Sequence, residues 1–235
     1  MNESPKLRKS KLYEQLKRDI LSLQLPPGHD LDEASLSEQF GLSRTPLREV
    51  LLQLVGEGYA EQHKNRGCRV AEMTHASLRN FFLAAPMVYG AVLQLAAQNA
   101  TPIQIARLKE AQMQFRAALK SGSAAERSLA NNAFHMITGE MADNAYLQPS
   151  FQRLLIDHAR IGVTFYRPQS TEMTENLSKA SEQHDAIIDS IEAHDAAEAA
   201  RLSTEHWNLS RGQIEMFVMP AGLEGQIALP AASEG

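Results

Sequence analysis

The sequence predicts a mainly α-helical protein in two parts: three helices followed by a β-hairpin, and then an antiparallel bundle of about six helices. Three observations support this fold class. Apolar residues recur at helical spacing through the first 58 residues, with turn signals between the runs. A short stretch with strand character follows. From residue 74 to about residue 220, the sequence contains only helical patterns.

The composition is typical of a soluble globular protein, with 43% hydrophobic residues among 235. The single cysteine, Cys68, excludes an intrachain disulfide. The polar N-terminal segment lacks the apolar region of a signal peptide, and no apolar run approaches the roughly 18 residues of a membrane span. We therefore expect a cytoplasmic protein with no membrane partner.

Charge is distributed unevenly along the chain. The net charge is −5, yet residues 1–72 contain eleven basic and eleven acidic residues. The acidic excess therefore lies entirely in the remainder. Because salt screens charges beyond about 8–10 Å, a local basic patch matters more than the total. The composition permits a module that binds nucleic acid, joined to an acidic domain.

The first part begins with three predicted helices. The first covers residues 10–23 and ends at a Pro-Pro-Gly turn. A short second helix lies within residues 32–40, with Gly41 just after its end. The third helix starts after Ser43, which we expect to cap it, and tolerates Pro46 in its first turn.

A predicted hairpin completes this part. Residues 59–73 read as two short strands around a turn at residues 64–67. Three helices with a tight connection between the second and third, followed by a hairpin, are typical of a winged helix-turn-helix. We assign residues 1–73 to this DNA-binding domain.

The second part reads as an all-helical domain over residues 74–220, for binding an effector and for dimerisation. Short connections between its helices favour an antiparallel bundle. Residues 221–235 have little to pack, and we expect a disordered tail. The predicted helices are 75–98, 102–120, 124–143, 146–166, 172–193 and 195–217.

The segment from Leu12 to Met73 resembles the N-terminal domain of GntR-type bacterial transcription regulators. The resemblance rests on "LPPG", on "LSEQFGLSRTPLREVL" and on "EGY" followed by "RGCRV". The helical remainder resembles the ligand-sensing domain of the FadR branch, particularly its FCD subgroup. The resemblance implies a transcription regulator that binds a palindromic operator in double-stranded DNA as a homodimer and responds to a small metabolite. We expect it to act as a repressor.

Two arginines at the start of the third helix, Arg44 and Arg48, lie four residues apart on one face. A helix N-terminus favours acidic residues, so these arginines require carboxylate partners or a negative partner outside the chain. Arginine can bond guanine in the major groove through two hydrogen bonds. The resemblance implies base or phosphate contacts for both arginines, with Ser43 and Thr45 near the DNA backbone. The alternative is pairing with Glu38 or Glu49.

The hairpin turn adds positive charge beside this helix. The resemblance places Lys64, Asn65, Arg66 and Gly67 in the adjacent minor groove, where glycine would allow a close backbone approach. Arg69, on the second strand, could contact DNA or simply be exposed.

Three histidines are predicted to point into the bundle. Asn131 and His135 share one helical face, and His184 and His206 lie on the apolar stripes of two further helices. Burying three imidazoles is costly unless they share a partner, and imidazole suits zinc, nickel and similar divalent ions. The alternative is three core histidines satisfied by water and polar neighbours.

The resemblance implies a metal site of the form Asp-x3-His, His and His, with Asn131 in the aspartate position. An amide oxygen is a neutral and weaker ligand, so we expect weaker metal binding, with water or effector in the remaining positions. Asn132 projects from a different face. His158 could line the cavity, but we expect surface or structural roles for all five other histidines: His29, His63, His75, His158 and His194.

The first bundle helix departs from the family. Members of the family often have an arginine in this helix and a glutamate four residues later, and this chain has Ala85 and Tyr89 in those positions. We also expect Pro86 to kink the helix. A carboxylate effector bound to the metal remains the expectation, with Tyr89 and Arg160 as candidate contacts.

Other functions remain open at this point. In one alternative, the helical domain serves only for dimerisation and binds no effector. In another, it binds an effector without a metal. A metalloenzyme is less favoured, because no Asp or Glu has a spacing in the sequence that would mark it as a general base. The sequence also contains no nucleophile motif.

Overall fold

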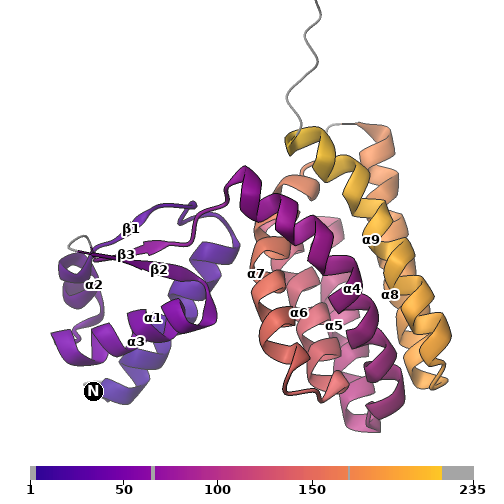
Figure 1. Ribbon diagram of the computed structural model, residues 1–235, viewed down its shortest axis with the longest axis horizontal. Helices are drawn as coiled ribbons and strands as arrows, with labels where there is room; N and C mark the ends of the chain where they lie inside the picture. Colours follow the sequence, from indigo (N-terminus) through magenta and orange to yellow (C-terminus); the bar gives the residue numbers. More distant parts are fainter. Residues whose placement is uncertain (1–3, 65–66, 169, 219–235) are drawn as a thin grey trace, which may run out of the picture.

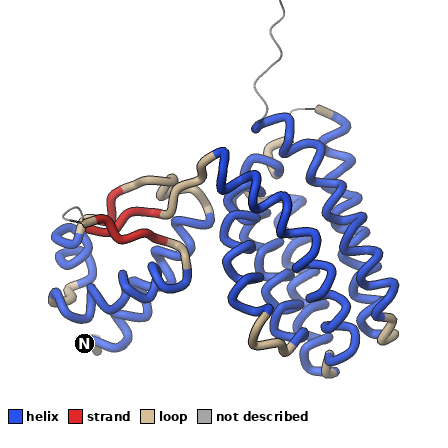
Figure 2. The backbone as a smooth tube through the Cα atoms, viewed as in Figure 1, coloured by secondary structure: helices blue, strands red, loops and turns tan. Residues whose placement is uncertain are grey.

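The structure is a computed structural model that describes residues 4–64, 67–168 and 170–218, with side chains as far as residue 209. Figure 1 shows two parts, a small N-terminal domain and a helical bundle. Figure 2 shows that the strands of the described chain belong to the N-terminal domain. The expected disordered tail, residues 221–235, lies outside the described residues.

The N-terminal domain contains helices α1 (Pro5–Leu21), α2 (Glu33–Phe40) and α3 (Arg44–Glu57). Helix α1 begins five residues before the predicted start. The Ser4 side chain accepts a hydrogen bond from the Leu7 N–H at 3.3 Å, and a proline suits the first helical position. The apolar pattern missed this first turn because most of its residues are polar and its one leucine, Leu7, is exposed.

The connection between α2 and α3 follows the expected pattern. Gly41 ends α2 in the left-handed conformation, with φ of 59°, and Gly58 ends α3 in the same way. The predicted inward face of α3 is buried, so the helix turns its polar face outward. This buried face consists of Leu47, Val50, Leu51 and Leu54.

The predicted hairpin is part of a three-stranded antiparallel sheet with the order β1-β3-β2. Its strands are β1 (Asp30–Leu31), β2 (Ala60–His63) and β3 (Gly67–Val70). The sequence did not indicate β1, because two residues are too short to show the alternation of a strand. Pairing with β3 reveals it, since Asp30 lies opposite Arg69 in the register.

Among the described residues, the bundle consists of six helices, whose ends each differ from the predicted ranges by one residue at most. Periodicity and turn signals are strong here because every helix has one buried face. The helices are α4 (His75–Asn99), α5 (Pro102–Ser121), α6 (Ala124–Ala142), α7 (Leu147–Phe165), α8 (Thr171–Glu192) and α9 (Ala196–Val218).

Helix α4 corrects the expectation that no segment is apolar enough to span a membrane, because it passes that test by length and composition. In this fold α4 lies against α6, α7, α8 and α9, and it buries Ala85, Tyr89 and Leu93. The helix is continuous through Pro86. Its apolar composition is therefore that of a helix with partners on several sides.

Helix α7 joins the two parts. Its residues Ile156 and Ala159 are buried in the same hydrophobic cluster as Leu16 and Leu54 of the N-terminal domain. Helices α1 and α3 both contact α7. The bundle and the N-terminal domain thus share a packed interface along one helix.

Candidate functional site

The four residues predicted to contact DNA from α3 lie together at its exposed end. Ser43, Arg44, Thr45 and Arg48 are all exposed, and Leu47 points into the core between them. Ser43 occupies the N-cap position, but its side chain makes no capping hydrogen bond, contrary to expectation. Its hydroxyl therefore remains available to another partner.

The two arginines of this surface differ in their surroundings. Arg48 Nε donates to Glu33 Oε2 at 3.0 Å, whereas the sequence suggested Glu38 or Glu49 as partners. Glu49 instead pairs with Lys9 at 2.6 Å. The Arg48 side chain is 62% exposed, so this ion pair contributes little and can exchange for another anion. Within the described residues, Arg44 has no ion pair.

The turn between β2 and β3 is described only in part. Lys64 is exposed, and Gly67 has a φ of 76° with open space where a side chain would begin. Asn65 and Arg66 lie outside the described residues. Arg69 pairs with Asp30 across β1 and β3, with Nη2 donating to Oδ2 at 3.2 Å. This pairing gives Arg69 a role within the sheet.

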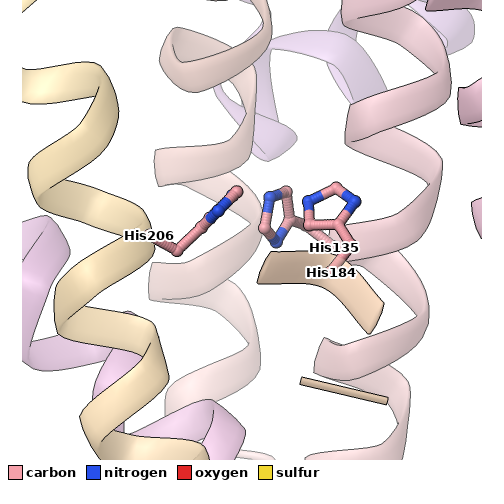
Figure 3. A group of neighbouring side chains, drawn as sticks. All are labelled: His135, His184 and His206. Carbon is pink, nitrogen blue, oxygen red and sulfur yellow. The ribbon is translucent and has the colours of Figure 1, made fainter. Parts of the chain in front are cut away.

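Inside the bundle, three predicted histidines come together from three helices. His135 of α6, His184 of α8 and His206 of α9 each offer a ring nitrogen, and these nitrogens lie within 4.8 Å of one another. Figure 3 shows the three imidazoles converging. His135 and His184 are buried, and His206 is partly buried.

Glutamine side chains orient two of these imidazoles. His184 Nδ1 donates to Gln112 Oε1 at 3.1 Å, and His206 Nδ1 donates to Gln183 Oε1 at 3.0 Å. The Gln112 amide is itself fixed, because its Nε2 donates to the Ser181 carbonyl at 2.8 Å. A proton on Nδ1 leaves the lone pair on Nε2, which is the form that binds a metal.

Several polar atoms in this part of the bundle have no hydrogen-bond partner among the described residues. His135 Nε2, His184 Nε2 and Asn131 Oδ1 are buried without a hydrogen bond. Burial lowers the pKa of His135 and His184 well below the usual value, and lowers the pKa of His206 to about 3. The imidazoles are therefore neutral, and a divalent ion fits this set of nitrogen and oxygen donors.

His158 also belongs to this cluster, although the sequence favoured a surface or structural role for it over a place beside the cavity. Its ring centroid lies 5.1 Å from that of His135, and its Nδ1 lies 2.7 Å from the Tyr89 hydroxyl oxygen. Burial lowers the pKa of His158 to about 4. The sequence carried a signal for this position, because His158 lies at helical spacing from Phe151 and Leu155, which are buried in α7.

The two candidate effector contacts occupy different places. Tyr89 lines a small cavity together with His135 and His158. Arg160 instead lies at the junction with the N-terminal domain, where Nη2 donates to the Ala71 carbonyl at 2.6 Å and Nη1 pairs with Asp157 at 3.3 Å. The helical turn of α7 sends Arg160 away from His158, which corrects its expected position.

The space beside the histidines is small. One cavity is lined by Asn131, His158 and His206 among others, and a second by Tyr89 and His135. Each holds about 10 Å³, which is room for about one water molecule. A larger ligand therefore requires side chains around the histidines to move.

Comparison with known proteins agrees with this architecture. The sequence pattern of the FCD domain matches residues 87–209, and that of the gntR family of bacterial regulatory proteins matches residues 8–70. The crystal structure of McbR/YncC from E. coli superposes with a TM-score of 0.74 at 20% identity, covering 93% of this chain and all of that one.

Two relatives from Escherichia coli K12 are described as HTH-type transcriptional repressors. RspR is 26% identical over 197 residues, covering 83% of each chain. GlaR is 28% identical over 200 residues, covering 83% of this chain and 90% of GlaR. These matches identify a transcriptional regulator rather than an enzyme. The chain belongs to the GntR family of DNA-binding transcription regulators, with an FCD domain as its helical part.

Proposed function

We propose that this regulator is a repressor that binds a palindromic operator as a homodimer and is controlled by a small organic acid bound beside a divalent metal. The observation that carries the proposal is the convergence of His135, His184 and His206, whose ring nitrogens lie within 4.8 Å of one another. Among the described residues, Nε2 of His135 and of His184 has no hydrogen-bond partner. The similarity to RspR and GlaR, which are both named as transcriptional repressors, supports repression. As a DNA-binding protein, it would act in the cytoplasm.

The DNA contacts follow from the exposed end of α3. Arg44 and Arg48 would contact bases or phosphates in the major groove, with Ser43 and Thr45 against the backbone. Lys64, Arg66 and Gly67 of the hairpin turn would approach the adjacent minor groove. The weak pair between Arg48 and Glu33 would open when a phosphate or a guanine replaces the carboxylate.

A homodimer is supported by an apolar surface on α4. Leu83 is 64% exposed and Met87 is 71% exposed, one turn apart on the same face. Exposed apolar patches commonly mark contact surfaces. Two copies related by a twofold axis would present two α3 helices to the two halves of a palindrome.

The metal site would use Asn131, His135, His184 and His206, and zinc or nickel suits these ligands. All four donors are neutral, so the bound ion would keep its full charge and attract an anionic group. This charge is what favours a carboxylate effector. Tyr89, with its hydroxyl beside His158, would contact that effector.

Helix α7 provides a physical link between the effector and the DNA-binding domain. His158 faces the histidine cluster, while Ala159 and Arg160 contact the N-terminal domain. An effector that moves His158 would shift the two following residues against that domain. The effector can regulate DNA binding only if its affinity differs between two arrangements of the DNA-binding domain relative to the bundle. The difference in binding free energy is typically about 1–3 kcal/mol.

The test combines metal analysis with a thermal-shift screen of small organic acids, using the full chain with and without EDTA. The proposal predicts close to one equivalent of zinc or nickel, and stabilisation by an acid such as malate only in the metal-loaded protein. An acid that stabilises the chelated protein equally would favour the metal-free alternative. No metal and no response to acids would favour a helical domain that only dimerises.

A further inference from the structure

Another cavity lies between the two domains, apart from the two small cavities beside the histidine cluster. It holds about 130 Å³, far more than the spaces beside the histidines. Helix α1 and the end of α3 form one wall, and α6 and α7 form the other. Its lining residues are Tyr13, Lys17, Glu57, Tyr59, Asn132, Met136, Gln152, Leu155 and Ile156.

One polar atom of a residue that lines this cavity, Asn132 Oδ1, has no partner among the described residues. Asn132 is only 7% exposed, and its Oδ1 is buried without a hydrogen bond. Its Nδ2 has a weak contact with Met136 Sδ at 3.5 Å. A buried amide oxygen without a donor is unfavourable, so this atom is suited to a ligand that carries an O–H or N–H group.

Lys17 provides a positive charge in the cavity wall, beside the negative charge of Glu57. The Lys17 ammonium lies 4.7 Å from the ring centroid of Tyr13 and 5.5 Å from that of Tyr59. The Glu57 carboxylate accepts hydrogen bonds from the Tyr13 hydroxyl at 2.6 Å and from Gln53 Nε2 at 2.9 Å. Lys17 has no ion pair within the described residues, so a carboxylate of a ligand would not have to displace one.

The remaining walls and the volume fit a single ring. Tyr59, Leu155 and Ile156 are buried and present apolar surface. A cavity of about 150 Å³ lined by apolar side chains is known to hold benzene. A six-membered ring with short substituents therefore matches this space.

We propose that this interdomain cavity is a second effector site, independent of the metal, for a small phenolic acid. The phenol hydroxyl would donate to Asn132 Oδ1, the ring would lie against the apolar wall, and the carboxylate would approach Lys17. Because both domains contribute walls, an occupant would stabilise one arrangement of the DNA-binding domain relative to the bundle. Asn131 and Asn132 are consecutive on α6, so this helix would contact both effectors.

Calorimetric titration of the full chain tests the site, after dialysis against EDTA to remove metal. The probes are 4-hydroxybenzoate and benzoate, which differ only in the hydroxyl. We expect the wild-type protein to prefer 4-hydroxybenzoate by about tenfold, the usual effect of one hydrogen bond to a buried acceptor. The N132L variant should lose this preference, because leucine has a similar size and no acceptor.

A second variant keeps the test informative if N132L fails to fold. Gln152 lies at the exposed rim, so Q152W should block the cavity and weaken both probes, whereas the exposed α5 variant Q114W serves as the matched control. Absence of 4-hydroxybenzoate binding, or binding unchanged in Q152W, would overturn the proposal. The same titration with zinc-loaded protein should give the same affinity, so the result does not depend on the metal site.

Discussion

The exposed end of α3 and the buried histidine cluster use polar side chains in opposite ways. At the end of α3, Arg48 forms only a weak ion pair in solvent, which we propose is exchanged for DNA. In the bundle, His135 and His184 are buried, and no group in the described part of the chain forms a hydrogen bond with their Nε2 atoms. The first surface can be changed with little effect on folding, whereas the second is tied to the core. Mutations at the end of α3 should therefore change DNA binding without changing stability. Mutations of the buried histidines should change both ligand binding and stability.

The largest expected effect is on DNA binding. Replacing Arg44 and Arg48 together by alanine should weaken operator binding on the order of a hundredfold or more, because each good base contact contributes about 1–3 kcal/mol. Fluorescence anisotropy on a DNA fragment selected by the wild-type protein would measure this. The melting temperature should stay unchanged, because both side chains are exposed. The matched control, Arg107→Ala on the bundle, should bind normally, and equal losses in both variants would contradict the assignment.

Removal of one metal ligand should have the next largest effect. His206→Ala should lower the affinity for zinc on the order of a hundredfold, because the remaining donors leave the ion incompletely coordinated. Competition with a chromophoric chelator gives the affinity. The exposed His29 provides a control, since His29→Ala should bind zinc like the wild type. Unchanged zinc affinity in His206→Ala would exclude His206 as a ligand.

Asn131 allows a gain of affinity to be tested. Asn131→Asp should bind zinc roughly 10–100-fold more tightly than the wild type, because a carboxylate adds negative charge beside a dication in a buried site. Asn131→Leu, which has no donor, should bind more weakly than the wild type. The same chelator competition orders the three proteins. If all three bind zinc equally, Asn131 lies outside the coordination shell.

Acid should destabilise the metal-free protein through its buried histidines. Their pKa values are lowered by burial, to about 4 for His158 and about 3 for His206, so the unfolded chain binds protons first as the pH falls below about 6.5. Stability should therefore be complete above that pH and decrease toward pH 4, by at most ~1.4 kcal/mol per pH unit for each histidine. Urea unfolding from pH 7.5 to 5 measures the slope. His206→Ala should reduce the slope of the free energy of unfolding against pH. A slope identical to that of the wild type would mean that protonation of His206 does not cause the acid destabilisation.

The smallest effect is expected at the ion pair beside α3. Glu33→Gln should change the free energy of unfolding by less than about 1 kcal/mol, because Arg48 is exposed. Operator binding should rise slightly, since Arg48 would no longer exchange a carboxylate for DNA. Chemical denaturation and anisotropy on the same protein check both points. A loss of several kcal/mol would mean that the pair stabilises the domain.

Much of the architecture could be predicted because it depends on neighbours along the chain. Gly41 and Gly58 end their helices through their own backbone freedom, and the buried face of α3 repeats every three or four residues. The inward direction of His135 and His184 followed from the same periodicity. Helix α1 began earlier than expected because a polar first turn depends on capping by Ser4 rather than on apolar spacing.

By itself, the sequence determined the helices, the family and the inward faces of His135, His184 and His206, because periodicity, caps and motifs are local properties. Only the tertiary structure decided which inward residues meet. It brought His158 to the histidines, took Arg160 to the Ala71 carbonyl and paired Asp30 with Arg69. These contacts join residues about 20 to 90 positions apart. Their partners depend on how helices and domains pack, and no local pattern carries that information.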